Sequence, residues 1–116
     1  MAKILLVDDE PTVLKLSKMI LEKHGFEITA FASPVEALSK SDPYDFDLIL
    51  SDLIMPEMRG TEMIKKFRAI RNDIKAIIIS ASADMTKIQE ESDASIYFLS
   101  KPFQFDKLVE LLNSIL

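Results

Sequence analysis

The sequence of 116 residues contains no cysteine, one histidine and two glycines. Without cysteine the chain has no disulfide and no thiolate zinc site, and a single histidine excludes metal motifs built on a histidine pair. Two isolated glycines, Gly25 and Gly60, exclude the Walker A loop and the G-x-G-x-x-G dinucleotide fingerprint. No glycine-rich loop is therefore present to hold a nucleotide.

Long hydrophobic runs are also missing. A membrane-spanning helix needs about 20 apolar residues, whereas stretches such as Ile4–Val7 and Ala76–Ile79 are short. Asp8 and Asp9 stand where a signal peptide would continue its apolar stretch. We therefore expect a cytoplasmic protein without membrane insertion. The net charge of -5 has the wrong sign for binding a phosphate backbone, so no direct nucleic-acid partner is expected.

The length fits one domain, residues 1–116, and 48% hydrophobic with 28% charged residues is the composition of a globular chain. Short, mostly apolar stretches recur at intervals of about 20–28 residues, which leaves room for one helix between each pair. Continuous apolar stretches are typical of strands buried on both faces. The predicted strands are Lys3–Val7, Glu27–Phe31, Asp47–Ser51, Lys75–Ser80 and Ile96–Ser100.

The intervening segments carry helix signals. Pro11 can open the first helix and Gly25 can close it, and Ser33-Pro34-Val35-Glu36 reads as a capping box for the second. Later helices are predicted at Thr61–Arg71, at Met85–Ser92 and from Gln104 to the C-terminus. The buried faces are expected to hold Val13, Leu14, Leu16, Ile20 and Leu21 in the first helix, Met63, Ile64 and Phe67 in the third, and Phe105, Leu108, Val109, Leu112, Ile115 and Leu116 in the last. Lys65, Lys66, Arg68 and Arg71 are expected to form a solvated face.

Ionisable or hydroxyl side chains follow four of the five strands. Asp8 and Asp9 follow the first, Asp52 the third, Ser80 ends the fourth and Lys101 follows the fifth. The second strand has no such group. In the order 2-1-3-4-5 the second strand is an edge and the other four tips are neighbours. The sequence therefore predicts an α/β fold with a five-stranded parallel sheet in this flavodoxin-like order and helices on both faces.

These side chains suit the transfer of a phosphoryl group. Clustered carboxylates repel one another unless a cation is present, and oxygen ligands without histidine or cysteine favour Mg²⁺, with Mn²⁺ possible. Lys101 suits the binding of an anionic oxygen. Because no loop can hold a nucleotide, the natural acceptor is a carboxylate nucleophile, which would form an aspartyl phosphate.

The sequence resembles the receiver domains of two-component response regulators, and it is similar in length to the single-domain chemotaxis regulator. The resemblance covers essentially the whole chain. It rests on four motifs in order: Val7-Asp8-Asp9-Glu10, the stretch from Asp52 through Met55-Pro56 to Gly60, Ser80-Ala81, and Lys101-Pro102-Phe103. Each motif alone is weak, but their order at strand ends is specific.

The resemblance implies that Asp52 accepts a phosphoryl group from a sensor histidine kinase or a phosphotransfer protein. It implies Mg²⁺ bound by Asp9, by Asp52, by Asp8 mainly through water, and by the backbone carbonyl of Ile54. Ser80 and Lys101 would each bind a phosphoryl oxygen. It also implies a cis Lys101–Pro102 bond.

The family's switch aromatic lies three residues before the lysine, which here is Phe98. The resemblance implies that phosphorylation draws Ser80 toward the phosphate, moves Phe98 into the vacated space and repacks the helix 4–strand 5–helix 5 face to control a downstream target. The protein would be a monomer or a phosphorylation-dependent dimer. Phe98 lacks the hydroxyl of the frequent tyrosine, and adjacent Tyr97 is expected on the other face of the strand.

Other functions stay open at this stage. The chain could be a small Mg²⁺-dependent phosphohydrolase with Asp8 or Asp52 as nucleophile, although such enzymes place D-x-D after the first strand and need a longer chain. It could be a phosphorylation-independent binding module, although the acidic site looks intact. Met1-Ala2 directly before the first strand fits a free-standing receiver, and a receiver excised from a larger regulator or hybrid kinase is the alternative.

Overall fold

The structure is a computed structural model that describes residues 1–81 and 95–116. The predicted helix Met85–Ser92 lies outside the described residues. The strands are β1 (Lys3–Val7), β2 (Glu27–Phe31), β3 (Leu48–Asp52), β4 (Lys75–Ala81) and β5 (Ile96–Lys101). The helices are α1 (Pro11–Lys23), α2 (Pro34–Lys40), α3 (Gly60–Arg68) and α5 (Phe105–Ile115), with a 3-10 turn, η1, at Pro43–Asp45.

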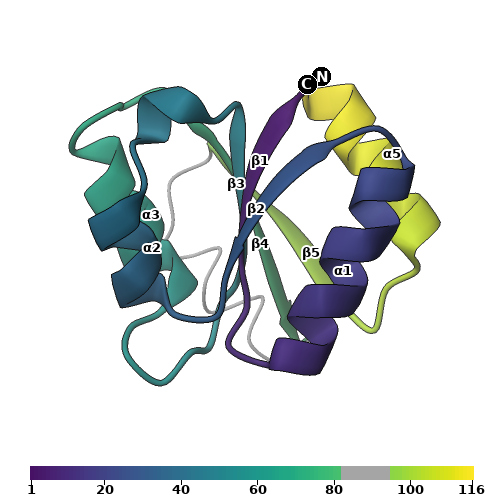
Figure 1. Ribbon diagram of the computed structural model, residues 1–116, viewed down its shortest axis with the longest axis horizontal. Coiled ribbons are helices and arrows are strands. Elements are labelled where there is room, and N and C mark those ends of the chain that lie inside the picture. The colour runs from purple at the N-terminus through teal and green to yellow at the C-terminus, as the bar shows by residue number, and fades with distance from the viewer. Residues whose placement is uncertain (82–94) are drawn as a thin grey trace.

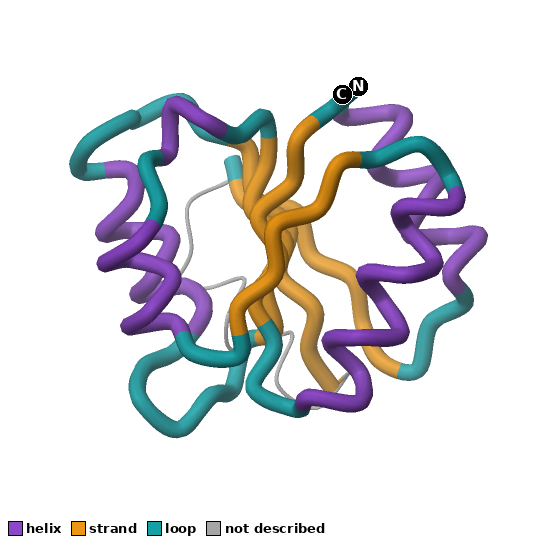
Figure 2. Tube along the Cα trace, viewed as in Figure 1, coloured by secondary structure: helices purple, strands orange, loops and turns teal. Residues whose placement is uncertain are grey.

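The five strands form one parallel sheet in the order β2-β1-β3-β4-β5, which confirms the predicted fold class. Helices α1 and α5 cover one face of the sheet, and α2 and α3 lie on the other (Figure 1). The carboxyl ends of the strands, with the loops that leave them, lie at the lower side of this view, while both chain termini lie at the opposite edge (Figures 1 and 2). Every strand therefore delivers its last residues to the same edge.

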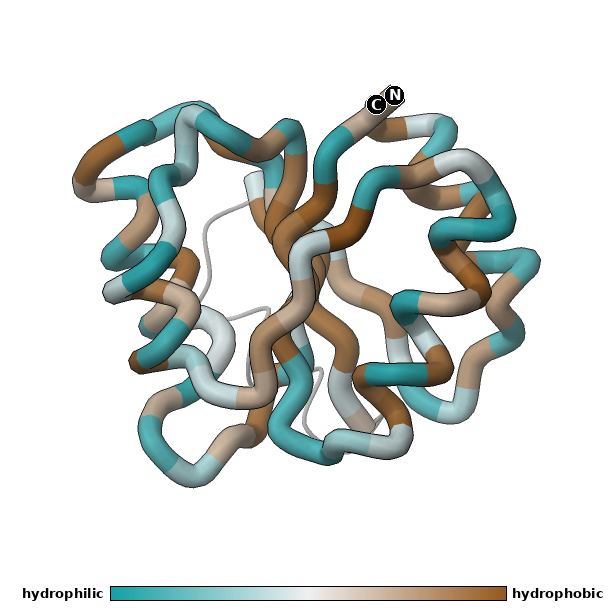
Figure 3. Tube along the Cα trace, in the orientation of Figure 1, coloured by the Kyte–Doolittle hydropathy of each residue, from teal (hydrophilic) through white to brown (hydrophobic). Residues whose placement is uncertain are grey.

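Two apolar cores pack against the two faces of the sheet. Alternate strand residues contribute to each core, so Leu5 and Ile49 face α2 and α3 while Leu6 and Leu50 face α1 and α5. Figure 3 shows hydrophobic colour concentrated along the strands. The central strands β1, β3 and β4 are buried on both faces, as their continuous apolar stretches predict, whereas the edge strands β2 and β5 are partly exposed.

The helix starts largely follow the predicted signals. Pro11 is the first residue of α1, and Gly25 adopts a φ of 91° directly after its end. The Ser33 side chain caps α2 by accepting a hydrogen bond from the N–H of Glu36 at 3.1 Å. His24 lies at the C-cap of α1, where its Nδ1 is 2.9 Å from the carbonyl oxygen of Ile20.

Some predicted helix details were wrong. Leu16 is 45% exposed, whereas Ser17 is 8% exposed and faces the interior. The sheet-facing stripe of α1 runs through Val13, Ser17 and Leu21, four residues apart, and Leu16 lies one position off it. Helix α3 ends at Arg68 rather than at residue 71, and the terminal Leu116 is 41% exposed.

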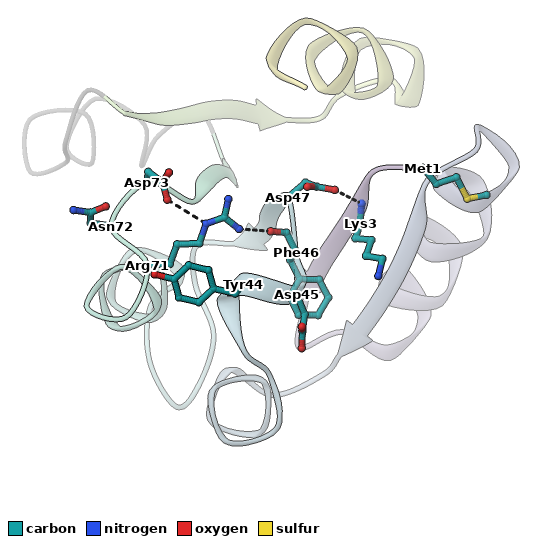
Figure 4. Close-up of a pocket in the computed structure, with 9 residues that line it drawn as sticks. All are labelled: Met1, Lys3, Tyr44, Asp45, Phe46, Asp47, Arg71, Asn72 and Asp73. Atoms are coloured by element: carbon teal, nitrogen blue, oxygen red, sulfur yellow. Dashed lines mark hydrogen bonds and ion pairs between the residues drawn. The ribbon is translucent and has the colours of Figure 1, made fainter.

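Arg68 and Arg71 do not belong to a solvated face, because their guanidinium groups hold backbone carbonyls. Arg68 donates to the carbonyl oxygen of Ile74 from Nε and Nη2, at 3.1 and 2.9 Å. Arg71 donates from Nη1 to the carbonyl oxygen of Phe46 at 2.6 Å and pairs with Asp73 (Figure 4). These bonds tie the end of α3 to the segments that enter β3 and β4.

The hollow drawn in Figure 4 has a volume of about 670 Å³ and is lined by residues such as Lys3, Asp47 and Arg71. These residues precede or begin strands, so the hollow lies at the amino edge of the sheet. It is therefore on the opposite side of the molecule from the predicted site.

The loop between β3 and α3 depends on a glycine. The N–H of Gly60 donates to the carbonyl oxygen of Leu53 at 2.8 Å and closes the loop at its base. A Cβ atom at position 60 would lie 2.3 Å from the carbonyl oxygen of Asp52 and 2.9 Å from Ile78 Cδ1. Real Cβ atoms do not approach a backbone oxygen so closely, so this closure requires glycine.

We predict that Gly60→Ala lowers the free energy of unfolding by about 1–3 kcal/mol, because the added methyl group must displace backbone in a packed region. Urea unfolding followed by circular dichroism measures the change. Thr61→Ala, one residue further along the same helix, is the control and should change stability less. Equal stability of Gly60→Ala and the wild type would contradict the close approach.

Candidate functional site at the carboxyl edge of the sheet

Three carboxylates meet at the carboxyl ends of β1 and β3. Asp8 and Asp9 directly follow β1, and Asp52 is the last residue of β3. The two strands are paired, with Val7 opposite Ser51, so their tips are neighbours. One carboxylate oxygen from each aspartate lies within 4.8 Å of the others. The structure thus brings together the acidic residues that the sequence placed at strand ends.

Backbone hydrogen bonds fix the tip of β1. The carboxylate Oδ1 of Asp8 accepts from the N–H of Glu10 at 3.0 Å, which turns the chain into α1. The N–H of Asp8 donates to the carbonyl oxygen of Phe31 at 3.2 Å. The end of β2, although it has no ionisable group, therefore helps to hold the aspartate pair in place.

Lys101 reaches the acidic cluster from β5. Its ammonium Nζ lies 3.0 Å from Oδ1 of Asp52, whose side chain is 14% exposed. In the register of β4 and β5, Ala81 pairs with Lys101 and Ser80 with Ser100. The Lys101–Pro102 peptide bond is cis, which confirms that prediction. A cation and three anionic side chains thus share one edge of the sheet.

Ser80 is a buried hydroxyl at the same edge. It is 2% exposed, and within the described part of the chain its Oγ has no hydrogen-bond partner. Leaving a buried hydroxyl unpaired costs about 1–3 kcal/mol. A donor in this condition beside a cluster of charged groups is suited to bind an oxygen atom of a guest.

Phe98 lies on β5, and Ile54 lies on the loop after β3. Phe98 pairs with Ile78 across the β4–β5 ladder and packs against the core under α2 and α3. Tyr97 is 45% exposed and, by strand alternation, faces the other side, as predicted. Ile54 is 52% exposed on the loop two residues after Asp52.

The environment of the acidic cluster shifts the pKa of one of its carboxylates. The pKa of Asp8 is raised above its ordinary value of 3.8, mainly because burial disfavours the charged form. The hydrogen bond from Glu10 lowers this pKa, whereas the negative charge of Asp52 raises it further. The ionised cluster is therefore a source of instability that a bound cation would remove.

The donor set fits a hard divalent cation. Asp8, Asp9 and Asp52 offer oxygen ligands within 4.8 Å of one another, and the chain supplies no cysteine. Lys101 pairs with Asp52, and one ammonium against three carboxylates leaves an excess of negative charge that could balance a metal charge. This arrangement is consistent with the Mg²⁺ site that the resemblance implies.

Two contributors to the site could not be anticipated from the sequence. The hydroxyl of Ser33 donates to Oε1 of Glu57 at 2.5 Å, which joins the start of α2 to the loop after β3. The sequence predicts Ser33 only as a helix cap, and no motif in the sequence marks Glu57 as a functional residue. The contact depends on two loops that approach only in the folded chain.

Comparison with known proteins decides the family. The family model "Response regulator receiver domain" matches residues 4–113. The chain belongs to the response regulator receiver family. It is 34% identical over 116 residues to the chemotaxis protein CheY of Bacillus subtilis, an alignment that covers 98% of this chain and 97% of CheY. The predicted membership is confirmed, and the receiver is a signalling domain of two-component systems.

Further relatives show how receivers occur. The chain is 32% identical over 108 residues to the C4-dicarboxylate transport regulator DctD of Rhizobium meliloti, but the match spans 24% of DctD. The response regulator TrrA of Thermotoga maritima, solved in complex with Mg²⁺-BeF, superposes with a TM-score of 0.86 at 32% identity and with full coverage of both chains. Receivers of this kind thus occur both alone and within longer proteins.

Among the described residues, no helix is both long and apolar enough to cross a membrane.

We predict that Asp8→Asn stabilises the receiver when Mg²⁺ is absent. Because the folded state raises the pKa of Asp8, it binds this proton more tightly than the unfolded chain does, and ionisation of Asp8 weakens folding as the pH rises above 3.8. Asparagine keeps the acceptor for Glu10 and carries no charge. At pH 7 the variant should therefore unfold at a higher urea concentration than the wild type, and the difference should shrink as the pH falls toward 3.8.

Asp45→Asn is the matched control, because Asp45 is an exposed aspartate at the amino edge of the sheet. It tests whether the loss of any one negative charge has the same effect. Equal stabilisation by both variants, or a difference that grows at low pH, would contradict the proposed origin of the effect in the acidic cluster.

Proposed function

We propose that this receiver accepts a phosphoryl group onto Asp52 from a phosphohistidine of a sensor kinase or phosphotransfer protein, with Mg²⁺, and passes the signal to a partner protein. The observation that carries the proposal is the pairing of Asp52 with Lys101 at 3.0 Å, beside two further carboxylates. A nucleophile, a cation for the phosphoryl oxygens and ligands for a metal thus lie at one place. Because ATP charges the donor kinase, we assign the exchange to the cytoplasm.

In the proposed transfer a carboxylate oxygen of Asp52 attacks the phosphorus of the donor. The new O–P bond forms while the P–N bond to the imidazole breaks, and the electron pair returns to the imidazole nitrogen. Bound Mg²⁺, held by Asp8, Asp9, Asp52 and the carbonyl of Ile54, would neutralise charge on the phosphoryl oxygens. The Lys101 ammonium and the Ser80 hydroxyl would donate to the remaining oxygens.

The proposed output is a change of packing beside the site. A hydroxyl drawn toward the phosphoryl group leaves space that Phe98 can enter, since Ser80 and Phe98 face the same side of neighbouring strands. The face of β5 and α5, with the segment before β5, would then present a different surface to its partner or to a second copy. The phosphoryl group must favour one of the two packings by about 3–5 kcal/mol to shift the equilibrium from mostly inactive to mostly active.

We predict that the wild type, incubated with acetyl phosphate and Mg²⁺, gains one phosphoryl group by intact-protein mass spectrometry. Asp52→Ala should gain none, because the nucleophile is lost. Asp47→Asn is the matched control: this aspartate lies one residue before the same strand, at the amino edge of the sheet, and should be phosphorylated like the wild type.

The same incubation, run in parallel with phosphate monoesters in place of acetyl phosphate, separates the alternative functions. Sustained turnover of phosphate monoesters would indicate a phosphohydrolase, and no phosphorylation of the wild type would indicate a binding module. Either result would overturn the proposed function.

We predict that Ile54→Asn shortens the lifetime of the aspartyl phosphate by about tenfold, the effect of one net hydrogen bond on a reaction barrier. The apolar Ile54 side chain cannot orient an attacking water, whereas an amide can, and its 52% exposure leaves room for the change. Loss of phosphate from the purified phosphoprotein measures the rate, and Ile54→Leu is the apolar control. An unchanged rate in Ile54→Asn would remove the argument.

A further inference from the structure

The segment at the end of β2, residues 31–33, makes hydrogen bonds to both the loop after β1 and the loop after β3. We propose that the hydrogen bond between Ser33 and Glu57 is a positioning contact, which holds the loop after β3 so that the carbonyl of Ile54 can serve the cation site. This inference rests on the proposed function, because it concerns the proposed ligand set.

The Ser33 hydroxyl both accepts and donates a hydrogen bond. Its oxygen accepts from the N–H of Glu36 at 3.1 Å, and its proton is donated to Oε1 of Glu57 at 2.5 Å. The first bond fixes the oxygen at the start of α2 and so directs the donor toward the neighbouring loop. A hydroxyl donating to a carboxylate makes a short and comparatively strong bond. Glu57 is therefore held from a rigid element rather than from another flexible side chain.

The loop after β3 needs a restraint at this position. Leu53 and Met55 are 1% and 6% exposed, and Gly60 closes the base of the loop. The two buried side chains fix the positions of their residues, whereas the Ile54 side chain between them is 52% exposed and does less to restrain the adjoining peptide planes against rotation. The Ile54 carbonyl belongs to these planes, and the outer stretch that follows is exposed. Holding Glu57 limits this rotation.

The same segment also holds the loop after β1, which carries Asp8 and Asp9. The carbonyl oxygen of Phe31 accepts from the N–H of Asp8 at 3.2 Å, two residues before Ser33. A single short segment, residues 31–33, therefore contacts both the loop with Asp8 and Asp9 and the loop with Ile54. The spacing between the carboxylates and the carbonyl is set through it, although β2 supplies no ligand itself.

The test is the affinity for Mg²⁺, measured by calorimetric titration of the protein with MgCl₂ before any phosphorylation. Glu57→Ala should weaken binding about threefold to tenfold, the effect of one net hydrogen bond. Glu57→Gln keeps an acceptor oxygen at the same place while removing the charge, so it should bind Mg²⁺ like the wild type. Equal weakening by alanine and glutamine would show that the charge of Glu57 matters and would overturn the proposal.

A second variant approaches the contact from the other side. Ser33→Gly removes the hydroxyl at a helix cap position where glycine costs only a few tenths of a kcal/mol relative to serine. It should weaken Mg²⁺ binding as Glu57→Ala does, and the double variant should be no weaker than either single variant, because both remove the same bond. Additive losses would overturn the proposal. Urea unfolding without Mg²⁺ verifies that each variant is folded.

The outcomes distinguish this inference from the function on which it rests. If the wild type binds no Mg²⁺ and is not phosphorylated by acetyl phosphate, the proposed function fails. If the wild type does both and Glu57→Ala binds Mg²⁺ equally well, the positioning role alone fails.

Discussion

The mutual repulsion of three carboxylates is the constraint on which the rest of this structure depends. Asp8, Asp9 and Asp52 lie within 4.8 Å of one another, and burial raises the pKa of Asp8. No apolar core could hold such a cluster, so it must lie at an edge where a cation can reach it. Lys101, 3.0 Å from Asp52, offsets one charge and leaves an excess of negative charge. A further cation bound here would offset this excess.

A parallel sheet meets this constraint because it collects strand ends at one edge. Parallel strands all end at the same edge, so the polar residues at the ends of β1, β3, β4 and β5 meet there while the apolar residues of the strands fill the two cores. The order β2-β1-β3-β4-β5 makes neighbours of the four tips that carry functional groups. Gly60, with no Cβ, then lets the loop after β3 fold back against the carbonyl of Asp52.

The sequence predicted those features that depend on local pattern. Strands β1 and β2 were predicted to the residue and β3 within one residue, because continuous apolar stretches mark buried strands. The aspartates and Lys101 were found because they follow strands. Features that depend on the approach of distant segments were not predictable: the burial of Ser17, the early end of α3 at Arg68, and the contact between Ser33 and Glu57. Each is decided by tertiary contacts rather than by spacing along the chain.

The hydroxyl of Ser80, for which the described residues provide no hydrogen-bond partner, links the site energetically to its surroundings. An unsatisfied buried hydroxyl costs about 1–3 kcal/mol, and a hydrogen bond to a charged group contributes about 1.5–3 kcal/mol. In the proposed phosphorylated state a phosphoryl oxygen would satisfy Ser80 while another pairs with Lys101. Together these contributions are comparable to the differential binding needed to shift a two-state equilibrium. Ser80 and Phe98 face the same side of adjacent strands. The new hydrogen bond of Ser80 would therefore form next to the aromatic side chain that would have to move. The side chain that would respond to phosphorylation thus lies on a strand next to the groups that would bind the phosphoryl oxygens.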